Sequence, residues 1–500
     1  MAATLLKIGP FVGGLNNISD PTSIKDTELA VCKNFDFDLD GTLISRPPIV
    51  ADTAAGPVAG QNIDIIGTYV TTAGASYIIG STDSQIWQKA SGVWTSIATG
   101  FRASAAIQYL DKMWIVSEPG SGVTGGSWDP GAGFTNVATM PKGQAITVFK
   151  DRLWIAAGPK ETTNTSRAYF SAIADGTTWN GADFLDVSKG DGDKLIDLIA
   201  ISSNLYLFKG NSTHVFQYDS APSKGVVTRI SNTIGVADVK CIVQYESTLY
   251  VYHNDYLYEL YNYNHTKVNV RLSISNNASG AYFRPITVSL IGVRVVVSFY
   301  NNIFVFYTLT RTWSQWVTFT TGRWYAIPTT PTDNNPNQYI CGSNSVNAAV
   351  TYSFTDGTVA GRSEPFNCRL ETKIYDFNAP NLFKKLSWWG VDCFAIGTVD
   401  SYAVPVIYTS NITWAQMSAF TWAQASINTW GQPLTADVRI HETLVVSGIG
   451  RKFLKFLKSA RFRNLYFIVD FTITDWLNTT RVYSITPTVA MKQQVSKAVN

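Results

Sequence analysis

Two stretches of this sequence, YLDKMWIVSEP (109–119) and FKDRLWIAAGP (149–159), decide the fold that it predicts. Each has a polar turn, then a run of apolar and aromatic residues, then a second turn. The pattern returns in ISSNLYLFKGN (201–211) and YESTLYVYHND (245–255), and more loosely in GASYIIGST (74–82), GVRVVVSFY (292–300) and NQYICGSNS (337–345). Alternating runs rich in β-branched and aromatic residues between turns are typical of strands. The stretches therefore predict a β protein with an internal repeat.

The repeat has the length of a propeller blade. Its steps are 37, 40, 52, 44, 45 and 44 residues, measured between Tyr77, Trp114, Trp154, Tyr206, Tyr250, Val295 and Tyr339. Four short strands in roughly 40–50 residues make one blade of a β-propeller. We predict an all-β fold with a β-propeller of six to eight blades at residues 59–365. A pair of β-sandwiches is the alternative, although a period beyond five units would be unusual for it.

Residues 366–500 have longer alternating runs without the blade period, which predicts an antiparallel β-sandwich. An insertion at 413–433 places a tryptophan at every eighth position, at Trp414, Trp422 and Trp430. This even spacing would put the three indoles on one face of an extended chain. They would then either pack on the sandwich or form a contact surface for a carbohydrate or a protein.

The composition narrows the class of protein. Charged residues make up only 15% of the chain, below the ~25% of an average soluble protein, and hydrophobic residues make up 45%. The net charge of +3 is too small to indicate nucleic-acid binding by itself. The five cysteines form no CxxC pair, so we expect buried free thiols. No run reaches the ~18 apolar residues of a spanning helix, so no membrane-spanning segment is expected.

The stretch NFDFDLDGTLISRPP (34–48) contains letters that match the nucleophile loop of haloacid-dehalogenase-type phosphatases, at Asp38 and Asp40. That loop needs a buried parallel strand before it and helices on both faces of the sheet. Here AVCKNFDF precedes the loop and two prolines follow it. A calcium loop fails as well, because Pro47 stands where the closing Glu should be. We therefore predict a turn, with Asp36, Asp38 and Asp40 pointing outward from an exposed strand edge.

Other candidate motifs lack their context. A GxGxxG at Gly120, Gly122 and Gly125 is not followed by a helix, which predicts an inter-strand loop. The GDGD at 190–193 is either a solvated loop or a weak calcium loop. The histidines have no metal-ligand or catalytic spacing, and they are His214, His253, His265 and His441. The sequence therefore predicts no catalytic, cofactor or metal site.

A basic ridge lies in RKFLKFLKSARFRN (451–464), which carries Arg451, Lys452, Lys455, Lys458, Arg461 and Arg463. As a helix, this segment would be amphipathic and could lie on a membrane. As strands, it would place cations on one side of a sheet edge. The ridge could then be solvated, face another subunit, or attract DNA phosphates.

The segment from GGLNNISDP through IKDTELAVCKNFDFDLDGTLISRPP (13–48) is similar to the opening segment of tail nozzle (tail-hub) proteins of short-tailed bacteriophages, and of propeller-bearing minor tail proteins in long-tailed phages. The matching positions are Gly13, Gly14, Asn34, Gly41, Leu43, Arg46, Pro47 and Pro48. The order of an N-terminal arm (1–58), a propeller and a closing sandwich with a basic strand pair also resembles that family.

The resemblance implies a structural virion protein without enzymatic activity or cofactors. It would be one subunit of a homo-oligomeric ring, usually a hexamer, that contacts portal, adaptor and tail fibre or tail tip proteins. DNA would pass through the ring during genome ejection without sequence-specific contacts. The protein would assemble in the host cytoplasm and remain in the phage tail. The alternatives are a minor tail protein of a long-tailed phage, or a carbohydrate-binding propeller (a lectin).

Overall fold

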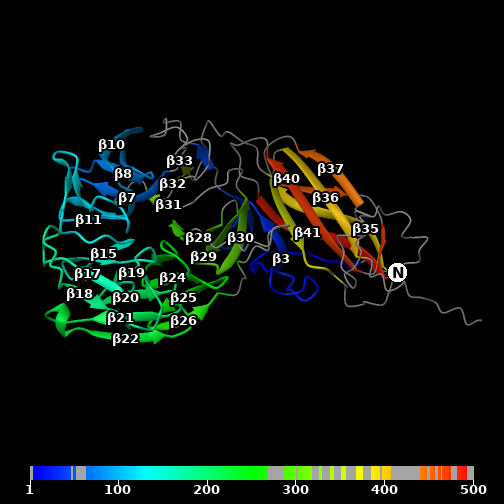
Figure 1. Ribbon diagram of the computed structural model, residues 1–500. Coiled ribbons are helices and arrows are strands. Elements are labelled where there is room, and N and C mark those ends of the chain that lie inside the picture. Colours follow the sequence, from blue (N-terminus) through cyan, green and yellow to red (C-terminus); the bar gives the residue numbers. More distant parts are fainter. Residues whose placement is uncertain are drawn as a thin grey trace, which may run out of the picture. The chain divides into compact units, whose positions relative to one another are not determined.

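The computed structural model describes residues 4–46, 49–51, 63–268, 272, 287–299, 302–317, 326–328, 338–342, 351–355, 367–375, 384–394, 397–406, 440–446, 451–456, 460–462, 464–473 and 481–491. They belong to two compact units (Figure 1). The propeller unit comprises residues 47–308 and 317–363, and the sandwich unit comprises residues 1–46, 309–316 and 364–500. Apart from one 3₁₀ turn at Pro222–Lys224, every regular element in these described ranges is a strand. The predicted all-β class is therefore confirmed.

The propeller unit consists of antiparallel sheets that follow one another along the chain. The first three blades are β7 (Asp64–Val70), β8 (Ser76–Ser81), β9 (Gln85–Ala90) and β10 (Val93–Thr99); β11 (Ala103–Tyr109), β12 (Lys112–Ser117), β13 (Gly126–Asp129) and β14 (Gly133–Asn136); β15 (Ala145–Phe149), β16 (Arg152–Ala156), β17 (Arg167–Phe170) and β18 (Phe184–Asp186).

The next blades are β19 (Leu195–Ile201), β20 (Asn204–Lys209), β21 (Thr213–Gln217) and β22 (Val226–Ser231); β23 (Ile242–Tyr245), β24 (Thr248–His253), β25 (Tyr256–Tyr261) and β26 (Asn264–Lys267); then β27 (Thr287–Ile291), β28 (Arg294–Phe299) and β29 (Asn302–Tyr307). The described strands thus give six blades before the chain returns to the start of the propeller.

The seventh blade closes the ring. It contains β31 (Ala326–Pro328), β32 (Gln338–Gly342) and β33 (Thr351–Thr355), and its fourth strand is β6 (Ile49–Ala51) from the other end of the propeller sequence. Val50 lies opposite Ser353 in this antiparallel pair. The first strand β7 contacts both β11 and β31, so blade one lies between blade two and blade seven. Seven blades fall within the predicted range of six to eight.

The repeated stretches form the first hairpin of each blade for a local reason. Both turn residues, Leu110–Asp111 in blade two and Lys150–Asp151 in blade three, have positive φ angles between 48° and 53°. Two successive residues with positive φ make the I′ turn, whose twist matches that of antiparallel strands. The indole of Trp114 donates to the Tyr109 carbonyl at 3.0 Å, and this hydrogen bond holds the two strands of the hairpin together.

The same aromatic residues join neighbouring blades. Trp154 of blade three is fully buried, and its ring centroid lies 5.5 Å from that of Phe216 in blade four. The hydroxyl of Tyr69 at the end of β7 donates to the Asp111 carbonyl in blade two at 2.7 Å. Tyr109 repeats this contact one blade later, with the Asp151 carbonyl at 2.8 Å. The repeat visible in the sequence is therefore a repeat of blade-to-blade contacts.

The sandwich unit has two sheets. One runs β38 (Arg451–Phe456), β35 (Lys384–Phe394), β41 (Arg481–Met491), β5 (Leu43–Ser45), β4 (Phe35–Phe37), with β1 (Thr4–Leu5) on β41 and β39 (Ala460–Phe462) on β35. The other contains β30 (Thr312–Val317), β3 (Glu28–Lys33), β34 (Asn367–Thr372), β40 (Asn464–Ile473), β36 (Gly397–Val406) and β37 (Ile440–Val446), with β2 (Gly14–Leu15) on β3.

Aromatic side chains pack between the two sheets. Trp389 of β35 is buried and stacks on Phe456 at 5.4 Å, and its ring lies 6.3 Å from that of Phe467 in the opposite sheet. Phe35 and Phe471 make a second contact between the sheets, edge to face at 6.0 Å. The Trp389 indole also donates to the Ser401 hydroxyl at 2.8 Å. Two sheets around one apolar layer make the predicted β-sandwich. Their described strands pair antiparallel, except that β3 pairs in parallel with β2 and with β30.

The two units divide the chain differently from the predicted boundaries at residues 58 and 365. The opening segment supplies β1, β4 and β5 to one sheet of the sandwich and β2 and β3 to the other. Its next strand, β6, belongs to the propeller. The first 46 residues are thus built into the sandwich. The described residues contain no helix of the length and apolarity needed to cross a bilayer.

We expect Trp154→Ala to lower the free energy of unfolding by about 3–5 kcal/mol, because it removes a buried ring that two blades share. Urea unfolding followed by far-UV circular dichroism measures this loss. The control is Leu110→Ala, which truncates a side chain that is 54% exposed and should change stability by less than about 0.5 kcal/mol. A loss below about 1 kcal/mol for Trp154→Ala would contradict this account of the repeat.

Candidate functional site

The DLDGT motif (38–42), which resembles a phosphatase nucleophile loop, forms the turn of the β4–β5 hairpin. The Asp38 N–H donates to the Thr42 carbonyl at 2.9 Å, and the Gly41 N–H donates back to the Asp38 carbonyl at 3.0 Å. Hydrogen bonds from the hydroxyl and the N–H of Thr42 hold the pKa of Asp40 below its usual value. Gly41 has a φ of 80°, and a Cβ there would lie 2.5 Å from a Val12 methyl. The loop thus closes an antiparallel pair, as predicted.

Asp36 does not point outward, so that prediction was wrong. Its exposed fraction is 4%, and its carboxylate accepts a hydrogen bond from the Trp316 indole at 3.1 Å. Phe35 and Phe37 on either side are buried too, because both faces of β4 are covered. Alternation alone could not reveal this, since a strand covered on both faces has no outward side.

Asn34 is the centre of a buried polar network. Its φ is 59°, a conformation that Asn tolerates better than most residues. Its side-chain oxygen accepts from Arg46 Nε at 2.9 Å, and its side-chain nitrogen donates to the Asn367 carbonyl at 2.7 Å. Its backbone N–H donates to the Gln315 carbonyl at 2.7 Å. One residue thus ties together segments near residues 34, 46, 315 and 367.

A thiol also reaches this junction. Cys368 Sγ donates to the Asn34 carbonyl at 3.1 Å, and Cys368 is fully buried. Burial raises the pKa of the Cys368 thiol and of the neighbouring Cys32 thiol. Four cysteines are described as free and buried, as expected, and they are Cys32, Cys241, Cys368 and Cys393. We call Asn34, Asp36, Arg46, Trp316 and Cys368 the opening-segment network.

The remaining motif positions have structural contacts as well. Gly14 has a φ of 66°, and a Cβ there would lie 2.8 Å from the Thr312 Cβ. The Gly13 N–H donates to the Thr27 carbonyl at 3.0 Å, and Leu43 is fully buried. Pro47 and Pro48 lie outside the described residues. The described part of the motif therefore fixes turns and packing in the sandwich core.

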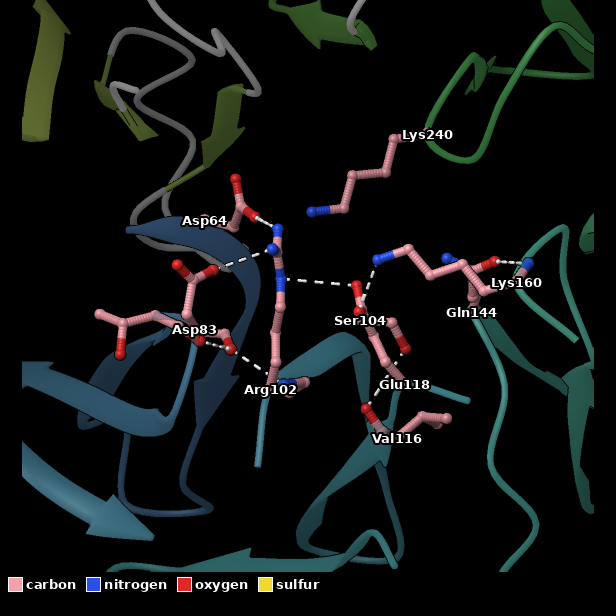
Figure 2. Close-up of polar contacts among 12 residues, drawn as sticks. Asp64, Asp83, Arg102, Ser104, Val116, Glu118, Gln144, Lys160 and Lys240 are labelled. Atoms are coloured by element: carbon pink, nitrogen blue, oxygen red, sulfur yellow. Dashed lines mark hydrogen bonds and ion pairs between the residues drawn. The ribbon is translucent and has the colours of Figure 1, made fainter. Parts of the chain in front are cut away.

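A second polar cluster lies where blades one, two and three meet. Figure 2 shows the Arg102 guanidinium between three carboxylates, at 2.6 Å from Asp64, 2.9 Å from Asp83 and 3.4 Å from Glu118. Glu118 also pairs with Lys160 of blade three at 2.6 Å. Arg102 stands immediately before β11 and Asp64 begins β7. These ion pairs therefore link the start of β7 in blade one to the start of β11 in blade two, and blade two to blade three.

Lys240 extends this contact to blade five. It stands two residues before β23, and Figure 2 shows its side chain pointing toward Asp64 and Arg102. Its ammonium donates to the Ile65 carbonyl in β7 at 3.3 Å. Its backbone N–H donates to the carboxylate of Asp197 at 3.2 Å. Burial raises the pKa of Asp197 to about 6. The contacts at this end hold blades together, and they leave each named charge beside a polar partner.

The predicted GDGD loop has its carboxylates engaged. Asp191 pairs with the ammonium of Lys209, which is fully buried. Asp193 accepts the backbone N–H groups of Gly210 and Asn211, both at 2.9 Å. Among the residues that the structure describes, no three His, Cys, Asp or Glu side chains are grouped as a metal site would require. The loop is thus a structural link between β18 and β19.

A serine and a histidine lie in contact beside this loop, but the histidine is poorly suited to act as a catalytic base. Ser188 Oγ lies 3.1 Å from His214 Nε2, and Arg229 Nε donates to the same nitrogen at 3.2 Å. Burial, followed by the Arg229 charge, lowers the pKa of His214 to about 4. A histidine with so low a pKa is a poor base near neutral pH. The contact joins the loop after β18 to β21 and β22 of blade four.

The other predicted motifs lie in separate places. The glycines of the GxGxxG lie in the loop between β12 and β13, as predicted. His253 and His265 are in blade five, on β24 and β26, and His441 is on β37. The glycines and these histidines therefore do not converge on one site.

The described part of the basic ridge forms strands, which rules out the amphipathic helix there. Both β38 and β39 pair with β35, so that Lys455 lies opposite Gly390 and Arg461 opposite Lys385. Strand alternation puts Lys452 on the opposite face from Arg451 and Lys455, so the prediction of cations on one side was wrong. The Lys455 ammonium lies 4.6 Å from the centre of the Trp388 ring. Outside the described residues are Lys458, Arg463, Trp414, Trp422 and Trp430.

We expect no phosphatase activity from the DLDGT turn. Wild type and Asp38→Asn should hydrolyse p-nitrophenyl phosphate with Mg²⁺ at the same negligible rate, because neither a parallel strand nor a helix presents Asp38. Absorbance of the released nitrophenolate measures the rate. A wild-type rate that Asp38→Asn abolishes would overturn the interpretation of the turn.

We expect Asn34→Ala to destabilise the sandwich unit by about 2–4 kcal/mol. It leaves buried partners of Asn34 unsatisfied, and alanine tolerates the positive φ at this position less well than asparagine does. Asn34→Gly loses the same hydrogen bonds but accepts this φ, so its loss should be about 1 kcal/mol smaller. Urea unfolding followed by tryptophan fluorescence compares the two variants. Wild-type stability of Asn34→Ala would show that the network does not hold the sandwich.

The chain matches no family model and none of the curated proteins compared with it. Solved structures similar to part of it include the extracellular domain of the putative one component system BT4673 from B. thetaiotaomicron, at 10% identity over 62% of this chain and 40% of that one, with a TM-score of 0.44. BamB from Moraxella catarrhalis is 13% identical over 72% of this chain and all of that one, with a TM-score of 0.39. The Pan2 WD40 domain from Neurospora crassa is 9% identical over 61% and 92%, with a TM-score of 0.41.

Proposed function

We propose that this protein is a structural subunit of a bacteriophage tail, at the nozzle or hub, and that it works by assembly rather than by catalysis. The observation that carries the proposal is the position of the segment resembling nozzle proteins. Its Asn34 and Arg46 lie in the buried core that joins the strands of the sandwich. The polar groups of this motif bond to one another and to the backbone of the sandwich, which supports a role in maintaining the fold.

The engaged polar groups elsewhere support the same proposal. Arg102 is surrounded by Asp64, Asp83 and Glu118, and Lys209 is buried against Asp191. Ion pairs between blades resist deformation of a ring, because moving one blade would separate charges that burial has partly removed from water. Such rigidity suits a particle component that must keep its shape while another molecule moves past it.

The proposed assembly is a ring of identical subunits, expected to be a hexamer, in contact with portal, adaptor and tail fibre or tip proteins. Ring symmetry uses one heterologous interface repeated around an axis. DNA would pass through the ring without base-specific contacts during genome ejection. In this proposal the protein is assembled in the host cytoplasm and ends in the virion.

We expect the purified chain, alone or mixed with a portal–adaptor complex of the same phage, to form a closed ring. Six copies of 54.9 kDa would have a mass of about 330 kDa in light scattering after size exclusion (6 × 54.9 kDa). Negative-stain electron microscopy should show the matching symmetry. A chain that stays monomeric at micromolar concentration in both samples would contradict the proposal.

A further inference from the structure

Strands β20 and β21 of blade four lie beside β25 and β26 of blade five (Figure 1). These strands and the β25–β26 turn carry two exposed tyrosines and two side-chain amides. Tyr261 ends β25 and is 52% exposed, and Tyr263 lies in the turn to β26 and is 43% exposed. Asn204 begins β20 and Gln217 ends β21, both in blade four. We call these four residues the tyrosine–amide patch.

The patch is preorganised by its own contacts. Gln217 Nε2 donates to the Tyr263 hydroxyl at 3.2 Å and also to Asn204 Oδ1. The Tyr263 hydroxyl donates to Asn204 Oδ1 at 3.4 Å. The Tyr263 ring packs at 6.4 Å from the buried Tyr206 ring, so one of its faces is supported by the protein. The side chains of Tyr263, Gln217 and Asn204 are thus held in place before any ligand arrives.

The backbone turn fixes where the Tyr263 ring stands. Asn262 and Tyr263 form the β25–β26 turn with φ angles of 46° and 64°. Gly or Asn would occupy the second position of such a turn at lower cost, since a bulky side chain at positive φ is strained. Leu110–Asp111 in blade two has positive φ angles as well, so this turn is a common element of the propeller. What distinguishes Tyr263 is an aromatic ring that is 43% exposed at such a turn.

We propose that the tyrosine–amide patch binds a neutral carbohydrate. The two tyrosine rings offer apolar faces with polar tips, which suit the C–H face and the hydroxyl rim of a pyranose. The hydrogen bonds above use Gln217 Nε2 and Asn204 Oδ1, which leaves Gln217 Oε1 as an acceptor and Asn204 Nδ2 as a donor. Both groups are uncharged, so they match sugar hydroxyls better than phosphate or sulfate groups. This inference goes beyond the proposed structural role and does not depend on it.

The test uses the full chain and saturation-transfer difference NMR with four neutral sugars: methyl glucoside, methyl galactoside, methyl mannoside and N-acetylglucosamine. We expect at least one to bind with a dissociation constant of about 1 mM. Tyr263→Asn keeps a residue that tolerates the turn and removes the ring. It should weaken binding about tenfold or more, and Gln217→Ala should weaken it as well.

The matched control is Leu110→Asn, which replaces an exposed apolar side chain in a turn of the same type in blade two. It should leave sugar binding unchanged. Thermal unfolding of each variant checks that the propeller is intact, and Tyr263→Asn should be at least as stable as wild type because the strain is relieved. The proposal is overturned if none of the four sugars binds. It is also overturned if Tyr263→Asn binds as well as wild type, or if Leu110→Asn loses binding equally.

Discussion

The pairing of Ile49–Ala51 with Thr351–Thr355 is the constraint on which the rest of this structure depends. It supplies the fourth strand of blade seven from the opposite end of the propeller sequence, so the ring is closed by hydrogen bonds between distant segments. The strands before it, β1 to β5, belong to the sandwich. One stretch of about fifty residues therefore has to satisfy the registers of two units. This explains why the stretch is dense in residues with narrow conformational requirements, such as Gly14, Asn34 and Gly41.

The opening-segment network shows how polar residues can define a core that apolar packing alone would leave ambiguous. The side-chain amide of Asn34 donates through its nitrogen to the Asn367 carbonyl and accepts through its oxygen from Arg46, so its two polar groups are used in different directions. A shifted register of β3 or β34 would leave one of these groups buried without a partner, which costs more than the net gain of a hydrogen bond. The network thus selects one strand pairing among those that hydrophobic burial would permit.

Much of the fold could be predicted from the sequence because its signals are local. The alternation in YLDKMWIVSEP and the two-residue turn at Leu110–Asp111 are properties of neighbouring residues, and they repeat at a blade's length. The closure by β6 was not predicted, since three residues carry no periodic signal. The burial of Asp36 was missed for a related reason: it depends on Trp316, 280 residues away. The one sequence signal for the cluster around Arg102 is position: Arg102 stands immediately before β11, the first strand of blade two. Lys240 stands in a similar position, two residues before β23, the first strand of blade five. The tyrosine–amide patch contains residues from two blades, so no single stretch of sequence could predict it.

The ring closure has a consequence for how the protein is made. Val50 and its partner Ser353 are 303 residues apart (353 − 50). At about 5–20 residues per second, a ribosome needs on the order of 15–60 s to synthesise the chain between them. During that time the nascent Ile49–Ala51 strand has no edge to join, while blades one to six can fold in sequence behind it. During biogenesis, β6 is therefore synthesised first and stays unpaired until the strands of blade seven have been made.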